Sequence, residues 1–156
     1  LRSLVRLIGR FRPTQVIPRA PDPRYHWSIY KGSDRGGEWD FNESWKRPGD
    51  LPLQAGFIRA SARAHDRVRA GLRLPIPVLA AASGEAGGQG KDFDPSFFST
   101  DVVLDPEAIL ARARRIGPLV ETHSVPGGLH DLLLSAGPIR DGVYSRLFAW
   151  LETIEP

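Results

Sequence analysis

The C-terminal half of the chain alternates apolar, strand-like runs with helix-like segments, and this order constrains the fold more than any other feature. Residues 75–82 predict a strand buried on both faces, and residues 119–125 predict a second strand. Between them, Asp105-Pro106-Glu107 has the residue types that begin a helix, and apolar residues over 143–154 indicate a closing helix. Strand, helix, strand, helix predicts a parallel pair with a crossover connection, and therefore an α/β fold.

The two halves of the chain differ in charge. Residues 1–73 carry 15 Lys and Arg against 7 Asp and Glu, a net +8, whereas residues 74–156 carry 6 against 11, a net −5. Because the basic residues are interleaved with acidic ones, a solvated surface is favoured over a nucleic-acid site. We expect residues 1–73 to form a helical unit with an aromatic loop, and residues 74–156 to form the α/β core.

Helical spacing predicts two helices in the first unit. The first covers residues 1–11, and the second covers residues 53–69 and ends near Gly71. His65 lies beside the apolar stripe of the second helix, which predicts a partly buried packing residue. Several prolines over residues 13–24 predict an extended connector. The apolar stripe expected for the first helix consists of Leu1, Leu4, Val5, Ile8 and Phe11.

Composition places the chain among globular proteins, with 41% hydrophobic and 25% charged residues. It has no cysteine, so disulfides and thiolate metal sites are excluded. Its apolar runs are too short to cross a bilayer, and no stable membrane insertion is expected. The chain begins at Leu1 and contains no methionine, which indicates a natural start upstream. Localisation therefore stays open, with the cytoplasm as the default.

An acid followed by a histidine forms the strongest chemical signal. Asp101 and His130 are both expected just beyond the carboxyl ends of predicted strands, at the sheet edge where α/β proteins bind ligands. A carboxylate that holds one imidazole nitrogen in a single tautomer lets the other nitrogen act as a general base. Asp92 and Asp94 are alternative acids, and Asp105 is better explained as a helix cap. The alternative interpretation makes Asp101 a loop hydrogen-bond acceptor and His130 a turn residue.

Aromatic residues gather between Tyr25 and Trp45, in a segment that glycines interrupt. They could line an apolar ligand site, with Trp39 and Phe41 as candidate substrate-binding residues, or pin an irregular segment to the body of the protein. No metal-ligand spacing appears among the four histidines, and we predict neither a metal nor another cofactor.

The residues of the second half resemble the α/β-hydrolase fold, and more closely its monoacylglycerol lipase, lysophospholipase and serine-aminopeptidase-like branch. The resemblance rests on Pro77-Val78-Leu79, on Thr100-Asp101-Val102-Val103-Leu104-Asp105 and on Gly128-Leu129-His130-Asp131. It covers residues 74–156, the C-terminal part of such a fold. Gly37-Glu38-Trp39-Asp40-Phe41 looks like the cap of some members, which implies that residues 1–73 are a cap or lid.

The resemblance implies a serine nucleophile in a Gly-x-Ser-x-Gly elbow that attacks a small-molecule ester or lipid-like substrate. The chain contains no such elbow, so it is expected to supply the acid and the histidine only, and to be inert by itself. Two alternatives stay open. One is an α/β-hydrolase with an aspartate nucleophile, and the other is a noncatalytic binding module with a basic, tryptophan-rich surface.

Overall fold

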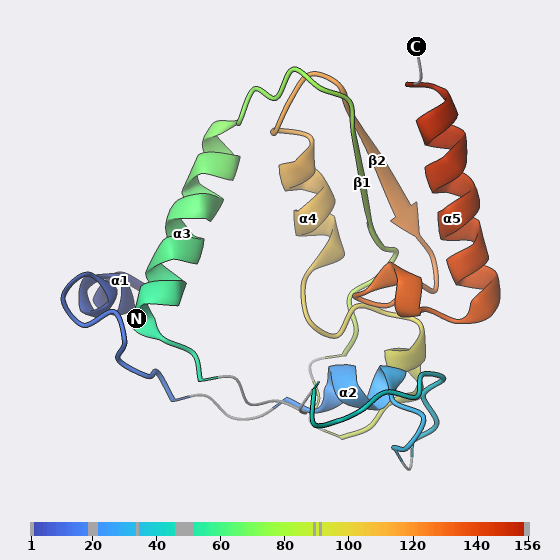
Figure 1. Cartoon of the computed structure of the whole chain (residues 1–156), viewed down its shortest axis with the longest axis horizontal. Helices are drawn as coiled ribbons and strands as arrows, with labels where there is room; N and C mark the ends of the chain where they lie inside the picture. Colours follow the sequence, from blue (N-terminus) through green and yellow to red (C-terminus); the bar gives the residue numbers. More distant parts are fainter. Residues whose placement is uncertain are drawn as a thin grey trace.

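The computed structural model describes residues 2–18, 22–33, 35–45, 52–88, 90 and 92–154, and it describes only the backbone of residues 2–6. Leu1 and the side chains of Leu4 and Val5, expected in the first apolar stripe, lie outside this description. In chain order the elements are α1 (Arg2–Phe11), α2 (Arg24–Ile29), α3 (Ala55–Ala70), β1 (Val78–Ser83), the 3-10 helix η1 (Pro95–Phe98), α4 (Pro106–Ala113), β2 (Val120–Val125), the 3-10 helix η2 (Leu132–Leu134) and α5 (Gly137–Glu152) (Figure 1).

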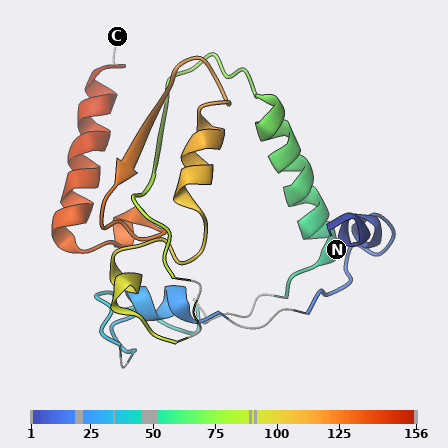
Figure 2. The ribbon, with the colours of Figure 1, turned by 180° about the vertical axis from the view of Figure 1, so that it is seen from behind.

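A parallel pair of strands forms the centre of the second half. β1 and β2 run in register from the pair Val78 and Val120 to the pair Ser83 and Val125, and the connection between them contains α4. Figures 1 and 2 show α4 on one side of this pair and α5 on the other. The predicted strand, helix, strand, helix order and the mixed α/β class are therefore confirmed.

The strand expected over residues 75–82 differs from the prediction in two respects. It begins at Val78 rather than Pro75, and most of its residues are half-buried, with only Ala82 and Ser83 buried. The reason is that, among the described residues, only one strand pairs with β1 and the helices cover its faces only partly. The closing helix is also longer than predicted, because α5 begins at Gly137.

Several well-buried apolar side chains lie near the carboxyl ends of the two strands. Phe97 of η1 is 1% exposed, and Leu129 in the loop after β2 is 3% exposed. Ile29 of α2 is fully buried, so α2 belongs to this region although it comes from the first half of the chain. The loops that carry Asp101 and His130 are therefore attached to a buried part of the protein.

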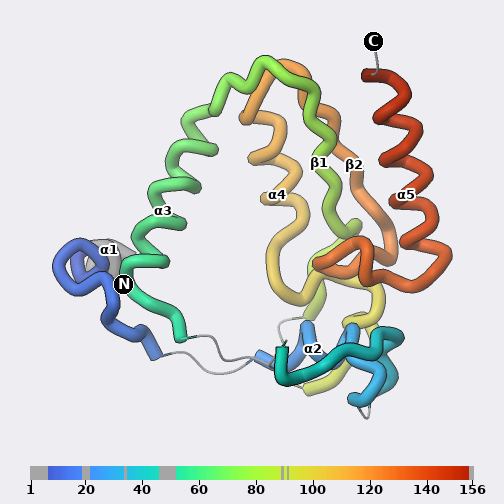
Figure 3. Tube along the Cα trace, viewed as in Figure 1, coloured from blue at the N-terminus to red at the C-terminus, as the bar shows by residue number. Residues whose placement is uncertain are grey.

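α1 and α3 pack against each other and lie away from the strands (Figure 3). α3 confirms the helix predicted over 53–69, and Gly71 adopts the positive φ of a helix end. Its expected inner face is only partly covered, since Ile58, Ala62 and Val68 are half-buried whereas Phe57 is 65% exposed and His65 is also exposed. The prediction that His65 is partly buried is therefore wrong. No described helix combines the length and the apolar character that a membrane crossing requires.

The aromatic segment is more regular than its glycines suggested. Tyr25 to Ile29 belong to the short helix α2, and the chain then turns back so that Trp39 lies beside Tyr30. The amide of Lys31 donates to the carbonyl oxygen of Trp39 at 2.8 Å, and the amide of Trp39 donates to that of Ile29 at 2.8 Å. The segment from Arg24 to Phe41, described except for position 34, is called the α2 segment below.

Candidate active site

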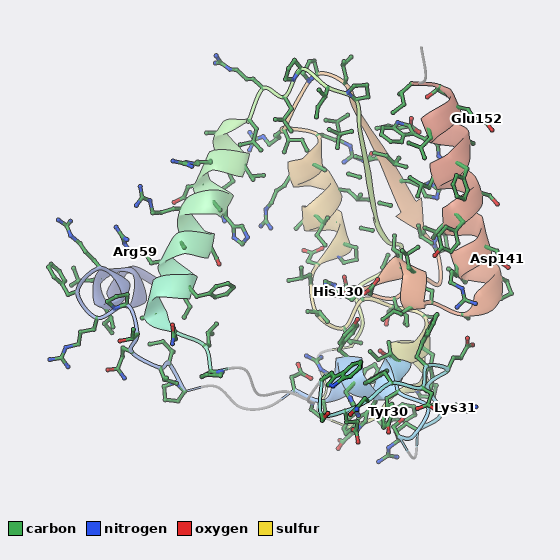
Figure 4. The ribbon with its side chains drawn as sticks, viewed as in Figure 1. Tyr30, Lys31, Arg59, His130, Asp141 and Glu152 are labelled. Atoms are coloured by element: carbon green, nitrogen blue, oxygen red, sulfur yellow. The ribbon has the colours of Figure 1, made fainter. Side chains whose placement is uncertain are left out.

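Asp101 and His130 meet directly. Nδ1 of His130 lies 2.9 Å from Oδ2 of Asp101, a hydrogen-bond distance. The Asp101 side chain is 1% exposed, whereas the His130 side chain is 30% exposed. A buried acceptor thus holds one nitrogen of an imidazole that solvent can reach in part. Figure 4 shows His130 between the strand ends and the α2 segment.

The other oxygen of Asp101 is held by its own loop. Oδ1 accepts hydrogen bonds from the backbone amides of Val103 and Leu104, both at 2.8 Å. The backbone of Asp101 also bridges to the loop after β1, because its amide donates to the carbonyl oxygen of Glu85 at 2.9 Å. These contacts offset the cost of burying a carboxylate and fix its direction toward His130.

The loop that carries His130 needs two glycines after β2. Gly127 has φ of +74°, in the region that favours glycine, and a Cβ on Gly128 would lie 2.7 Å from Cδ2 of Leu132. Two buried serines then hold the loop. Oγ of Ser83 donates to the carbonyl oxygen of Gly128 at 2.6 Å, and Oγ of Ser135 accepts from the amide of Leu129 at 2.9 Å.

A cavity of about 400 Å³ lies beside His130, between the sheet and α5. Its polar lining includes His130, His123 and Arg146, and Arg146 forms an ion pair with Glu121. Its volume is within the range of ligand sites. Most of its walls are apolar and come from both strands and helices, namely Leu79, Ala81, Leu132, Leu133, Val143 and Leu147.

The chain has no significant match to a family model, a characterised protein or a solved structure.

The other acids are accounted for by local structure. Oδ1 of Asp105 accepts from the amide of Ala108 at 3.1 Å and caps α4, as predicted. Oδ1 of Asp94 accepts from the amide of Ser96 at 2.8 Å, and this backbone hydrogen bond lowers the pKa of Asp94. Asp92 is exposed. Of the predicted acids, Asp101 is the one that the structure brings to His130.

Trp39 and Phe41 make internal contacts instead of lining the cavity beside His130. Nε1 of Trp39 donates to the carbonyl oxygen of Leu134 at 2.7 Å, and the Arg140 guanidinium lies 5.0 Å from the Trp39 ring centroid. Phe41 packs on Tyr30 with ring centroids 4.8 Å apart. These contacts match the alternative in which the aromatic residues pin the segment to the body of the protein, and a direct role in substrate binding stays a prediction.

The histidines lie at separate places in the fold. His26 pairs with Glu43 at 3.2 Å, His65 is on the exposed face of α3, and His123 lines the cavity from β2. Within the described residues, no three His, Cys, Asp or Glu side chains are grouped so as to hold a metal ion.

Three contacts around the pair were not predicted from the sequence. Ser83 and Ser135 hold the His130 loop, and the ring of Tyr25 packs against the imidazole with centroids 5.8 Å apart. The position of Ser83 at the end of a strand is a weak signal for such a role. The sequence contains no signal that pairs Tyr25 with His130, because the contact depends on where the α2 segment folds.

Proposed function

We propose that this chain carries the acid and base of a serine-hydrolase centre, in the C-terminal part of an α/β-hydrolase fold. The observation that supports it best is the 2.9 Å contact between Nδ1 of His130 and a buried carboxylate oxygen of Asp101. With Nδ1–H donated to Asp101, Nε2 is left unprotonated and can accept a proton. In this proposal residues 74–156 belong to the catalytic core and residues 1–73 form a cap.

The proposed reaction is hydrolysis of a carboxylic ester. Nε2 of His130 removes the proton of a hydroxyl as its oxygen attacks the ester carbonyl carbon, and the imidazolium then donates that proton to the departing alcohol. Asp101 stays ionised throughout and stabilises the imidazolium. Water repeats the cycle on the acyl intermediate and releases the acid. The hydroxyl comes from outside these residues, because no serine of the chain has glycine on both sides at the spacing of an elbow.

The cavity beside His130 suits a substrate with an apolar group. Leucine and valine side chains form much of its wall, and a ligand in it would lie next to the imidazole. A small ester or lipid-like molecule is therefore the proposed substrate class. The binding-module alternative is less well supported, because the indole N–H of Trp39 already donates to Leu134 and its ring faces Arg140.

The test uses the longest natural polypeptide that contains this sequence. Its hydrolysis of p-nitrophenyl butyrate is compared with that of the His130→Ala variant, and both are labelled with a fluorophosphonate that reacts with activated serines. We expect His130→Ala to lower kcat by at least about a thousandfold and to abolish labelling. The 156-residue chain alone should show neither turnover nor labelling.

His65→Ala is the matched control, because it removes an exposed histidine on α3. It should leave turnover and labelling unchanged. Retained turnover in His130→Ala would overturn the proposal. Turnover that depends on His130 without serine labelling, with oxygen-18 from water entering an aspartate, would instead support the aspartate-nucleophile alternative.

A further inference from the structure

The imidazole of His130 has a second neighbour besides Asp101. The ring of Tyr25 meets it edge to face, with ring centroids 5.8 Å apart and an interplanar angle of 88°. Edge-to-face contact is a favoured arrangement of aromatic rings. We propose that Tyr25 is a positioning residue for His130, which keeps Nδ1 on Asp101 and couples the α2 segment to the acid–base pair. This inference rests on the proposed function for its catalytic consequence, but not for its geometry.

The hydrogen bond to Asp101 does not by itself fix the imidazole. The second side-chain torsion of histidine has a broad preference, so an imidazole held at one nitrogen can still tilt about that contact. The His130 side chain is 30% exposed and is therefore only partly enclosed by protein. A ring standing perpendicular to it restricts this tilt, because the imidazole plane cannot rotate without losing the contact or meeting the phenol ring.

Tyr25 can act in this way because the α2 segment is itself anchored at several points. Nη1 of Arg24 donates to the carbonyl oxygen of Gly88 at 2.7 Å, which attaches the start of α2 to the loop after β1. Nε1 of Trp39 donates to the carbonyl oxygen of Leu134 at 2.7 Å, which attaches the end of the segment to η2, shortly after His130. The segment that carries Tyr25 is thus attached to the loop after β1 and to η2.

The phenol of Tyr25 stays neutral over the pH range in which a histidine base works. Burial, and to a smaller extent the nearby charges of Asp131 and Asp101, raises the pKa of Tyr25 to about 12. An uncharged ring does not compete with Asp101 for the positive charge that His130 acquires. The contact can therefore orient the imidazole in both of its protonation states.

The test is nuclear magnetic resonance of the 156-residue chain labelled with nitrogen-15 in histidine. In the wild type we expect His130 to be a single tautomer with the proton on Nδ1 and a downfield signal for that proton. Tyr25→Leu should give mixed tautomers and lose the downfield signal, whereas Tyr25→Phe should retain both features because it keeps the ring. Tyr25→Met serves as the second ring-deleting variant if Tyr25→Leu does not fold.

Tyr30→Leu is the control, since Tyr30 belongs to the same segment but packs on Phe41 and His26 (Figure 4). It should leave the His130 signals unchanged. The proposal is overturned if the ring-deleting variants leave the tautomer unchanged, if Tyr25→Phe is as disturbed as they are, or if Tyr30→Leu has the same effect.

Kinetics of the longer polypeptide separate this inference from the proposed function. Tyr25→Leu should lower kcat about tenfold with little change in KM, and Tyr25→Phe should restore it, because misorientation of a base affects the proton transfer more than substrate binding. If the wild-type polypeptide hydrolyses no ester, the proposed function fails while the tautomer measurements still decide the role of Tyr25.

Discussion

Asp101 is the residue on which the candidate site depends most. Its side chain is 1% exposed, and its two oxygens accept from the Val103 and Leu104 amides and contact Nδ1 of His130. A buried carboxylate is costly unless it is well hydrogen-bonded, and here the same group both closes its own loop and orients a histidine. The interpretation of Asp101 as a loop acceptor and its interpretation as the partner of His130 therefore describe one arrangement.

Asp101→Asn should separate these two roles. Its amide oxygen can still accept from the two backbone amides, but an NH₂ group then faces Nδ1 of His130 and favours the tautomer with the proton on Nε2. We expect this tautomer to appear in nitrogen-15 spectra, together with a loss of about 1–3 kcal/mol in the free energy of unfolding, measured with urea. An unchanged His130 tautomer would contradict the assigned contact.

The raised pKa of Tyr25 predicts that the free energy of unfolding falls as the pH rises in the alkaline range. Its folded pKa of about 12 lies above the ordinary value of 10.0, so the folded state holds the phenolic proton more tightly than the unfolded chain. The resulting stabilisation is complete below pH 10 and is lost as the pH rises toward 12. Unfolding by urea between pH 9 and 12 should show this decline, and Tyr25→Phe should make it shallower. An equally steep decline in Tyr25→Phe would show that other groups cause the loss of stability.

At the scale of elements, local signals place the helix that precedes β2. Asp105 caps α4 through the amide of Ala108, and Pro106 follows at the first helical position, where its missing N–H leaves no hydrogen bond unmade. α4 then packs on both strands and carries the buried side chain of Leu110. The cap is exposed, so its contribution concerns stability and not the chemistry of the site.

Asp105→Ala should lower the free energy of unfolding by about 1 kcal/mol, because the first turn of α4 loses a side-chain hydrogen bond. Asp105→Asn, which keeps an acceptor, should lose much less. Thermal unfolding followed by circular dichroism measures both, and the His130 tautomer should be the same in both variants. A cost equal to that of Asp101→Asn, accompanied by a change in the tautomer, would show that the α4 cap and the Asp101 hydrogen bonds are not independent.

At the scale of the molecule, contacts between distant parts of the chain assemble the site. Arg24 reaches the loop after β1, Trp39 reaches η2, and Tyr25 lies on His130 between them. The α1 and α3 pair lies apart from this assembly (Figures 1 and 2). The side chain of Phe57 on α3 is exposed. Residues 1–73 thus contain two different parts. The α2 segment is attached to the site, whereas α1 and α3 lie apart from it.

Trp39→Phe should loosen the α2 segment without removing its aromatic packing. The variant loses the indole donor to Leu134, at an expected cost of about 1 kcal/mol in the free energy of unfolding. Hydrogen exchange followed by mass spectrometry should show faster exchange in residues 24–41. Trp45→Phe is the control, since Trp45 is 88% exposed, and it should leave exchange in that segment unchanged. Faster exchange in both variants would contradict the anchoring role of Trp39.

Prediction from the sequence succeeded where structure depends on neighbours along the chain, as for the cap at Asp105 and the glycine end of α3. It also succeeded for the parallel pairing of β1 and β2, because the strand, helix, strand order requires a crossover connection. It failed for the exposure of His65 and for the burial of β1, because burial depends on what packs against an element and not on its own periodicity. The proximity of Asp101 and His130 was predicted because parallel strands end at the same edge of a sheet.

The sequence by itself determined the α/β order, the cap of α4, the glycine end of α3 and the two residues that meet beyond the strands. The elements and the α4 cap rest on hydrogen bonds between near neighbours and on the period of apolar side chains, which a short window of sequence contains. The meeting of Asp101 and His130 was predictable from the order of the elements, because parallel strands end at the same edge of a sheet. Only the tertiary structure decided that Tyr25 lies against His130 and that Trp39 donates to Leu134. These contacts join residues that are far apart in the chain. Their formation depends on the turns between the elements, and a periodic sequence pattern does not specify the dihedral angles of those turns. The contacts therefore form only when the whole chain has folded.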